Sequence, residues 1–352
     1  MKSVAIVALT LAAAAATFAA AAPRAPVAPL SQRLSETGLF MPGSTRVSTA
    51  VMAFAPQYPL WSDGTRKRRW IQLPAGTSID ASRADAWEFP VGTKVWKEFG
   101  YGKAIETRLI ERVADGSWRF ATYVWNADGS DAILAPEDGA VVRVNDAPGG
   151  RYAVPSRGDC VACHEGPAVP VLGFSALQLS SDRDPLAPHA DPKRAGQMDL
   201  RTLAESGVLR GLPAELLSAP PRIAAPTPTA RAALGYLHGN CGHCHNAAGA
   251  LTGLELVLAQ QADRAAHSAE RTLESLLGHS SRFRPHGGES TQRIAADHGS
   301  SVLTLRMKTD NPLARMPPLG VQVVDTEGVA LIERWIANDL QPALSTLQET
   351  AP

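Results

Sequence analysis

The chain has 352 residues, of which 45% are hydrophobic and 19% are charged, so it is long enough for two or three globular domains. Its 34 basic and 34 acidic side chains cancel to a formal net charge of zero. The composition therefore gives no global electrostatic argument for binding nucleic acid or an anionic membrane surface.

The first residues have the pattern of a secretory signal peptide. Lys2 supplies a positive start, and the apolar stretch 4–18 is too short to span a bilayer comfortably. Small residues at 19–22 offer a cleavage site, so we expect residues 1–22 to be removed and the mature protein to be periplasmic. An uncleaved anchor helix is the alternative. No later apolar run has the length of a membrane span, so stable membrane insertion is not expected.

The next part of the chain has the composition of a leader followed by a β domain. Residues 23–50 are rich in alanine, proline and serine, which predicts a flexible leader. From 51 to 150, short β-branched and aromatic runs alternate with Gly and Asp turns, which predicts a mostly β, sandwich-like domain. The clearest runs lie at 70–73, 94–99, 106–110 and 118–125. The basic run 66–69 either docks an acidic redox partner or guards an exposed strand edge with charge.

Beyond residue 150 the pattern becomes helical. Helices are expected at 200–208, 230–237, 265–277 and 326–340. A proline- and threonine-rich linker precedes the second of these, with Thr229 placed to cap it. We therefore predict a multidomain chain, in which the β domain is followed by mainly α segments at 151–228 and 229–345.

All four cysteines fall in two strings of the form Cys-x-x-Cys-His, at 160–164 and 241–245. This string is the signature of c-type haem attachment, in which the histidine becomes an axial ligand of the iron. The predicted α segments are then a first haem segment and a second haem domain of cytochrome c type. Two covalently bound haem c groups are expected, attached and ligated by Cys160, Cys163 and His164 and by Cys241, Cys244 and His245.

Paired cysteines also occur in two other kinds of site, which stay open as alternatives. A zinc site with four cysteine ligands would have to join two pairs that lie far apart in the chain, each followed by histidine. A thioredoxin-like redox pair would need a βαβ context, which the sequence does not show.

The sequence after the second string offers a second axial ligand for its iron. Met316 precedes Pro317 and Pro318 in a loop before a terminal amphipathic helix, so we expect it opposite His245. Thioether ligation opposite histidine raises the reduction potential of the iron. A core-filling role for Met316, with Met307 as a rival ligand, is the alternative.

The first string has no such partner. The candidates to lie opposite His164 are His189, Met198 and His238, and none of them has a ligand-like context. An iron with an open position would bind small ligands, whereas a six-coordinate iron favours electron transfer. The main functional hypothesis is therefore electron transfer, and the alternative is a peroxidase-like di-haem oxidoreductase with an open first haem. A third hypothesis makes the tryptophan-rich β domain a binding module. The alternative is that these tryptophans pack in the core of the domain.

Several distinctive stretches resemble a known family. They are 58–64, 69–76, 87–94, 236–241 and 315–318. Together they are similar to a family of bacterial di-haem c-type cytochromes with an N-terminal β domain, typically encoded beside a parallel β-helix repeat protein. The similarity runs from about residue 50 to 340. It implies the two haems and a redox protein partner, for which the β-helix protein is one candidate, and it implies no substrate.

Overall fold

The computed structural model describes residues 28–167, 169–249, 251–284, 291–297 and 300–349. The predicted signal peptide, residues 1–22, lies outside the described residues. Within the described ranges, every helix is too short or too polar to cross a membrane.

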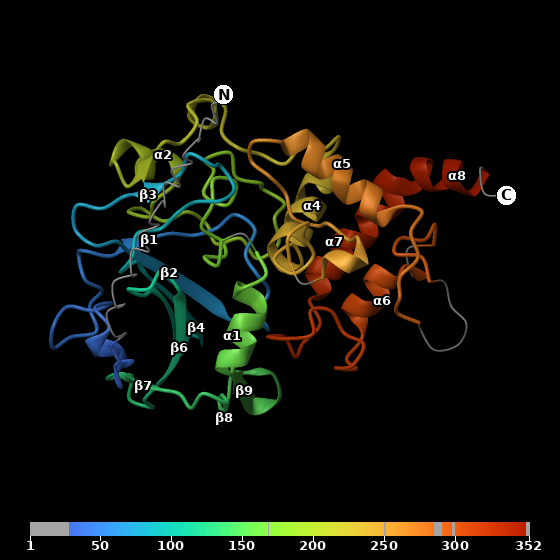
Figure 1. Cartoon of the computed structure of the whole chain (residues 1–352). Helices are drawn as coiled ribbons and strands as arrows, with labels where there is room; N and C mark the ends of the chain where they lie inside the picture. The colour runs from blue at the N-terminus through green and yellow to red at the C-terminus, as the bar shows by residue number, and fades with distance from the viewer. Residues whose placement is uncertain (1–27, 168, 250, 285–290, 298–299, 350–352) are drawn as a thin grey trace, which may run out of the picture.

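A six-stranded antiparallel sheet is the largest element of the structure (Figure 1). Its strands, in spatial order, are β1 (Met52–Ala53), β2 (Arg66–Gln72), β4 (Lys94–Tyr101), β5 (Lys103–Arg112), β6 (Trp118–Trp125) and β7 (Ala132–Leu134). Two small sheets pair β3 (Ile79–Asp80) with β10 (Leu209–Arg210), and β8 (Ala140–Arg143) with β9 (Arg151–Val154). The strands predicted from the aromatic and β-branched runs are confirmed as β2, β4, β5 and β6.

Side chains along each strand point alternately to the two faces of the sheet, and both faces are buried. On one face Trp70, Trp96 and Tyr123 form a hydrophobic cluster that also contains Leu34 and Leu39 from the N-terminal segment. Residues 28–50, whose composition predicts a flexible leader, thus supply fully buried side chains to the core. The N-terminal segment covers this face of the sheet, because burying large apolar side chains away from water is favourable.

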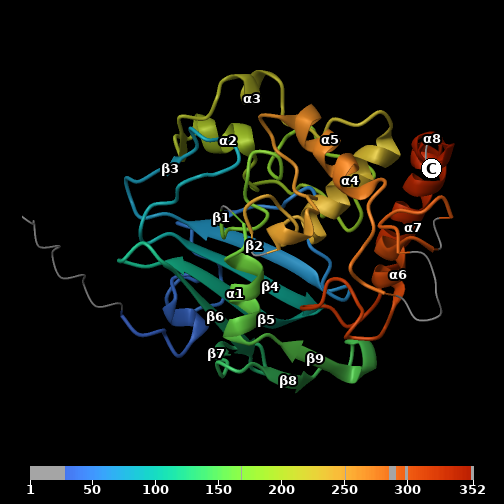
Figure 2. The same ribbon diagram turned by 45° about the vertical axis from the view of Figure 1, so that its right-hand side comes forward.

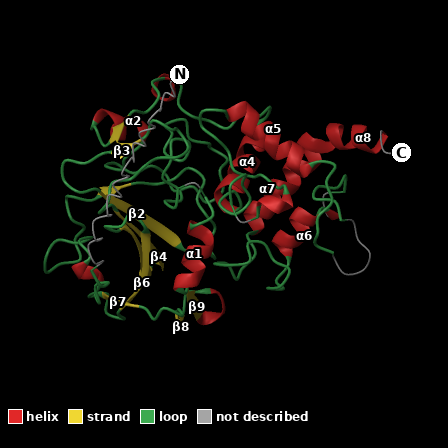
Figure 3. Ribbon diagram, in the orientation of Figure 1, coloured by secondary structure: helices red, strands yellow, loops and turns green. Residues whose placement is uncertain are grey.

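The helices are short and lie mostly on the other side of the sheet (Figures 2 and 3). They are α1 (Arg157–His164), α2 (Leu200–Glu205), α3 (Glu215–Ser218), α4 (Pro228–Asn240), α5 (Ala265–Leu276), α6 (Val302–Lys308), α7 (Thr326–Trp335) and α8 (Gln341–Glu349). A π-helical turn, Ile336–Leu340, joins α7 to α8, and 3-10 turns lie at Leu34–Glu36, Pro148–Gly150 and Thr252–Leu254.

The four predicted helices are confirmed as α2, α4, α5 and α7, with one difference at a cap. Thr227 rather than Thr229 caps α4, and its hydroxyl accepts from the Ala230 N–H at 3.0 Å. The reason is that Pro228 fits the first position of a helix, where a backbone N–H has no partner in any case.

The predicted fold class, however, is wrong. The helices of the described residues contain only 4 to 13 residues each, and the large sheet dominates, so the chain is not a β domain followed by mainly α haem domains. One hydrophobic cluster includes Phe54, Ile71, Phe174, Leu234 and Trp335, which come from the predicted β domain and from both predicted haem segments. In the described part of the chain the sheet also faces no second large sheet, as a sandwich would require. Short helices and long connections cannot form separate cores, so they pack against the sheet instead.

The loop Tyr58–Asp63 joins the sheet to the helical side. The Tyr58 ring lies so close to α4 that a Cβ atom on Gly235 would be 2.0 Å from the ring, and one on Gly239 would be 2.5 Å from the Tyr58 carbonyl oxygen. The Trp61 backbone N–H donates to Asn240 Oδ1 at 2.7 Å, at the end of the same helix. Because Gly235 and Gly239 have no side chain, the loop and α4 can be in direct contact.

Replacing Gly235 by alanine is predicted to destabilise the protein. The added methyl group must displace the Tyr58 ring, and overpacking of this kind costs about 1–3 kcal/mol. The free energy of unfolding, measured by denaturant titration, should fall by that amount. Gly253→Ala is the matched control, because nothing lies within 4 Å of a Cβ atom there. Equal effects of the two substitutions would contradict the close contact.

Candidate functional site

A cavity of about 1180 Å³ lies between the second face of the sheet and the helical side, and both Cys-x-x-Cys-His strings line it. This volume exceeds the roughly 300–1,000 Å³ of a pocket for one small molecule. Its walls are largely apolar and aromatic, including Trp87, Phe120, Phe174 and Phe283. The cavity therefore suits one very large or two flat apolar ligands.

The first string lies on α1, which packs against β6. Ser156 caps the helix through a reciprocal pair of bonds, in which its hydroxyl accepts from the Asp159 N–H at 3.0 Å and the Asp159 carboxylate accepts from the Ser156 N–H at 2.9 Å. Cys160, Cys163 and His164 thereby lie on a fixed helix and reach the cavity.

The His164 ring is oriented by a backbone carbonyl. Its Nδ1 lies 2.6 Å from the Pro170 oxygen, and a carbonyl oxygen only accepts hydrogen bonds. The hydrogen of the neutral ring is therefore on Nδ1, which leaves the Nε2 lone pair free. A metal-bound histidine usually has this kind of second contact, which fixes the tautomer and the ring orientation.

The second string continues the end of α4. Cys241 ends the helix, and its carbonyl oxygen accepts from the Cys244 and His245 N–H groups at 3.1 and 2.8 Å. One turn of chain thus carries both thiols and the imidazole. The two strings also meet, since a Cβ atom on Gly166 would lie 3.0 Å from the His243 carbonyl oxygen. The structure brings all six predicted attachment and proximal residues to one place.

The four thiols are free and protonated. None forms a disulfide. Burial raises the pKa of Cys163 to about 11 and that of Cys241 to about 12, and it also raises the pKa values of Cys160 and Cys244. Nucleophilic cysteines have lowered pKa values instead, so the site lacks the features of a thiol catalyst.

The imidazoles of the two strings are neutral. Burial lowers the pKa of His164 and of His243 to about 4, and it lowers the pKa of His245 as well. Neutral imidazole is the form that ligates a metal, so these side chains need not lose a proton first. Nδ1 of His245 is buried and has no hydrogen-bond partner among the described residues.

Met316 lines the same cavity, in a half-buried loop. The loop is held at several points. The Met316 N–H donates to the Arg306 carbonyl at 2.9 Å, and the Asp63 carboxylate accepts from the Gln322 and Val323 N–H groups at 2.8 and 2.9 Å. Met307 also reaches the cavity, but it is 8% exposed and belongs to the main hydrophobic cluster.

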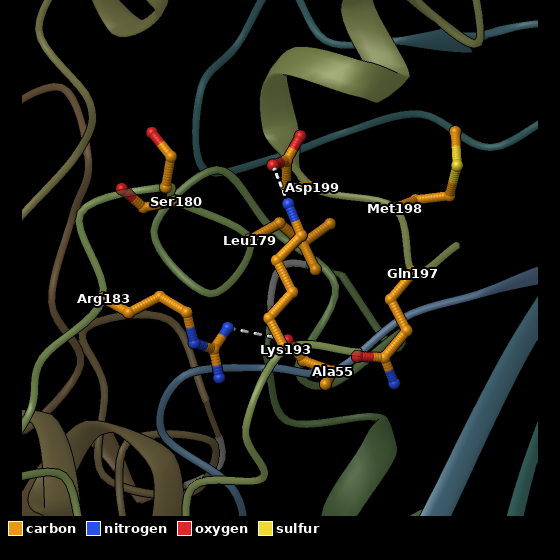
Figure 4. Close-up of a pocket in the computed structure, with 9 residues that line it drawn as sticks. Ala55, Leu179, Ser180, Arg183, Lys193, Gln197, Met198 and Asp199 are labelled. Atoms are coloured by element: carbon orange, nitrogen blue, oxygen red, sulfur yellow. Dashed lines mark hydrogen bonds and ion pairs between the residues drawn. The ribbon is translucent and has the colours of Figure 1, made fainter. Parts of the chain in front are cut away.

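The three candidates to lie opposite His164 are placed elsewhere or engaged. Nε2 of His189 lies 2.8 Å from the Asp325 carboxylate. His238 does line the cavity, but its Nδ1 accepts from the Gln260 N–H at 3.0 Å, so its Nε2 carries the hydrogen and lacks a free lone pair. Met198 lines a separate small pocket, which Arg183 and Lys193 also line (Figure 4).

The cavity wall is rich in positive charge, which the sequence did not reveal. Three acids line it, Asp85, Asp159 and Asp325. Nine cations line it, namely Arg69, Lys97, Arg108, Arg264, Arg271, Arg282, Arg293, Arg306 and Arg315. Because the whole chain is neutral, this local excess favours an anionic occupant.

The basic run 66–69 lies on β2, which β4 flanks along its whole length but β1 flanks only at Trp70 and Ile71. In the described part of the chain, residues 66–68 therefore lie at an edge of the sheet, as the edge-guarding alternative expects, whereas Arg69 adds to the positive charge of the cavity. The Arg69 side chain is 5% exposed and faces the cavity, whereas Arg68 points to the opposite face and pairs with Glu98 at 2.7 Å.

Comparison of the chain with protein-family models, with curated proteins and with solved structures finds no match. Among the described residues, no three His, Cys, Asp or Glu side chains gather in a way that could hold a bare metal ion. A haem brings four ligands of its own to the iron, so the chain has to supply only axial ligands. The haem prediction and the resemblance to di-haem cytochromes remain predictions that rest on the sequence.

Proposed function

We propose that this protein is a periplasmic c-type cytochrome that holds two covalently bound haems in one cavity and transfers single electrons. The observation that carries the proposal is the shared cavity, which both Cys-x-x-Cys-His strings line and whose volume is about 1180 Å³. The Cys-x-x-Cys-His pattern, which is the signature of c-type haem attachment, indicates that the ligand is haem.

The residues that line the cavity fit haem, the group that the two Cys-x-x-Cys-His strings imply. The free thiols of Cys160 and Cys163 would attach one haem and those of Cys241 and Cys244 the other. His164 offers an oriented Nε2 lone pair, and apolar walls with excess cations suit a flat apolar ring with acidic substituents. When bound, each haem supplies an iron that gains or loses one electron. The chain's own part is to hold the ligands, exclude water and set the local charge.

Electrons must enter and leave through another molecule. A redox protein is the expected partner, and the parallel β-helix repeat protein of the resemblance is the candidate that the sequence offers.

A second function is favoured by one observation at the first string. None of His189, Met198 and His238 presents a free ligand atom next to His164. An iron there would be left with an open position, as in a peroxidase-like di-haem oxidoreductase. Carbon monoxide added to the reduced protein should then change the absorption spectrum of one haem and leave the other unaltered. A spectrum without any change would exclude the second function and leave electron transfer.

The haem content is the direct test of the proposed function. Protein expressed with its N-terminal segment in a host that attaches haem c should carry two haems per chain, counted by denatured-protein mass and by the pyridine haemochrome spectrum. Cys160→Ser with Cys163→Ser should leave one, and Cys241→Ser with Cys244→Ser should leave the other. Substituting all four cysteines should leave none. A chain that matures without haem would contradict the proposal.

Met316 is predicted to ligate the haem of the second string. Met316→Leu should lower one of the two midpoint potentials by on the order of 0.1 V, within the roughly 0.8 V range that axial ligands span. Loss of the thioether removes the ligand that favours the reduced iron. Met307→Leu is the matched control and should leave both potentials unchanged. A drop seen with Met307→Leu and not with Met316→Leu would reverse the assignment.

A further inference from the structure

The sheet face toward the cavity carries three cations side by side. Arg69 of β2 lies opposite Lys97 of β4, and Lys97 lies opposite Arg108 of β5. All three line the cavity, and we call them the cation row. Neighbouring strands are about 4.8 Å apart, and like charges directly opposite each other destabilise a sheet.

The outer members of the cation row have acidic partners. Arg69 lies 3.5 Å from Asp191, and the Arg108 Nε donates to Glu106 at 2.7 Å. Glu106 is also engaged by the Tyr152 hydroxyl, which donates to it at 2.9 Å. Both contacts use Oε1 of Glu106, and its Oε2 is buried without a hydrogen-bond partner among the described residues.

Lys97, at the centre, has no acidic partner. Among the described residues, no carboxylate lies within 4.0 Å of its ammonium nitrogen, which contacts the face of Phe99 at 4.8 Å from the ring centroid. Burial, followed by the charges of Arg69, Lys67 and Arg108, holds the pKa of Lys97 well below 10.5, and the negative charge of Glu106 offsets this only in part. Desolvation and repulsion both oppose the charged form of Lys97, so a nearby counter-charge is needed to keep this side chain as an ammonium.

The missing counter-charge would lie beside the first string. Thr122 of β6 continues the row opposite Arg108, and α1, which carries Cys160, packs against β6. The positive charges of Arg108 and Lys97 also act on Cys163 and His164. The open side of the row thus faces the part of the cavity where the first haem is expected.

We propose that the cation row is an oxyanion site, in which Lys97 and Arg108 together bind a carboxylate or another small oxyanion. Guanidinium and ammonium groups are the usual partners of such anions in protein interiors. The anion has two possible sources, a propionate of the first haem or a free oxyanion that enters the cavity. The propionate source rests on the proposed function, whereas the free oxyanion does not.

The test uses the haem-loaded full chain and the variant Lys97→Met. Haem content is counted first on every sample, so that a failure of haem attachment is seen separately from a failure of the oxyanion site. Midpoint potentials are then measured in sodium chloride and in sodium sulfate at equal ionic strength. Loss of the cation should make one of the two potentials more negative, because positive charge near a haem favours the reduced iron. Lys97→Arg, which keeps the charge, should retain the wild-type potential.

Lys94→Met is the matched control. Lys94 is on the same strand but on the opposite face, where its ammonium donates to the Thr37 carbonyl oxygen at 2.9 Å. It should leave both potentials unchanged. If Lys97→Met does not fold, Lys97→Gln replaces it, because glutamine is also uncharged and keeps a hydrogen-bond donor.

The two salts separate the sources of the anion. A shift of the same size in chloride and in sulfate identifies the haem propionate, because that group is always present. A wild-type potential that is more negative in sulfate than in chloride, by a difference that Lys97→Met abolishes, identifies a free oxyanion. Potentials that stay at wild-type values in both salts overturn the proposal, since removing a cation next to a bound anion cannot leave the nearby iron unaffected.

Discussion

The contact between the Tyr58–Asp63 loop and α4 is the interaction on which the rest of the structure depends. Tyr58 lies over the bare backbone of Gly235 and Gly239, and its hydroxyl donates to Asp184 at 3.2 Å. The same loop reaches the segment behind Met316, where Trp61 Nε1 donates to the Val323 carbonyl at 3.1 Å. The loop therefore fixes the second string and the methionine loop against the sheet that supports the first string. The shared cavity results from these contacts.

The strands and helices were predictable because they leave local signals, and the two Cys-x-x-Cys-His strings are local signals of the same kind. Alternating apolar residues mark β2, β4, β5 and β6, and the two Cys-x-x-Cys-His strings are short enough to be recognised alone. The fold class was not predictable in this way. It depends on contacts such as Trp61 with Val323, which join residues far apart in the chain and leave no periodicity in the sequence. Leu34 and Leu39 were missed for the same reason, because an alanine- and proline-rich segment does not show which of its few large residues find a core.

The charges of the cavity illustrate a second limit of sequence reading. Arg69, Lys97 and Arg108 come from three strands, and each has apolar or charged neighbours that are ordinary for a strand. Only the register of β2, β4 and β5 reveals that they lie opposite each other. A run of basic residues such as 66–69 reads as a solvated face when the position of its strand in the sheet is unknown. Because side chains alternate between the two faces of a strand, Arg69 of this run faces the cavity although Arg68 beside it is exposed.

The two strings differ in their surroundings although they share a cavity. The second string has Met316 in a loop that Arg306 and Asp63 hold in place, which suits a stable, six-coordinate iron. In the first string, His164 is oriented by a backbone carbonyl, and the cation row lies nearby. None of its three candidate ligands presents a free ligand atom. Positive charge in a poorly solvated site acts strongly on a nearby redox centre, since the interaction is less screened than in water. With haems bound as proposed, the potential and ligand preference of the first site would depend on the charges of the neighbouring sheet, and those of the second on His245 and Met316.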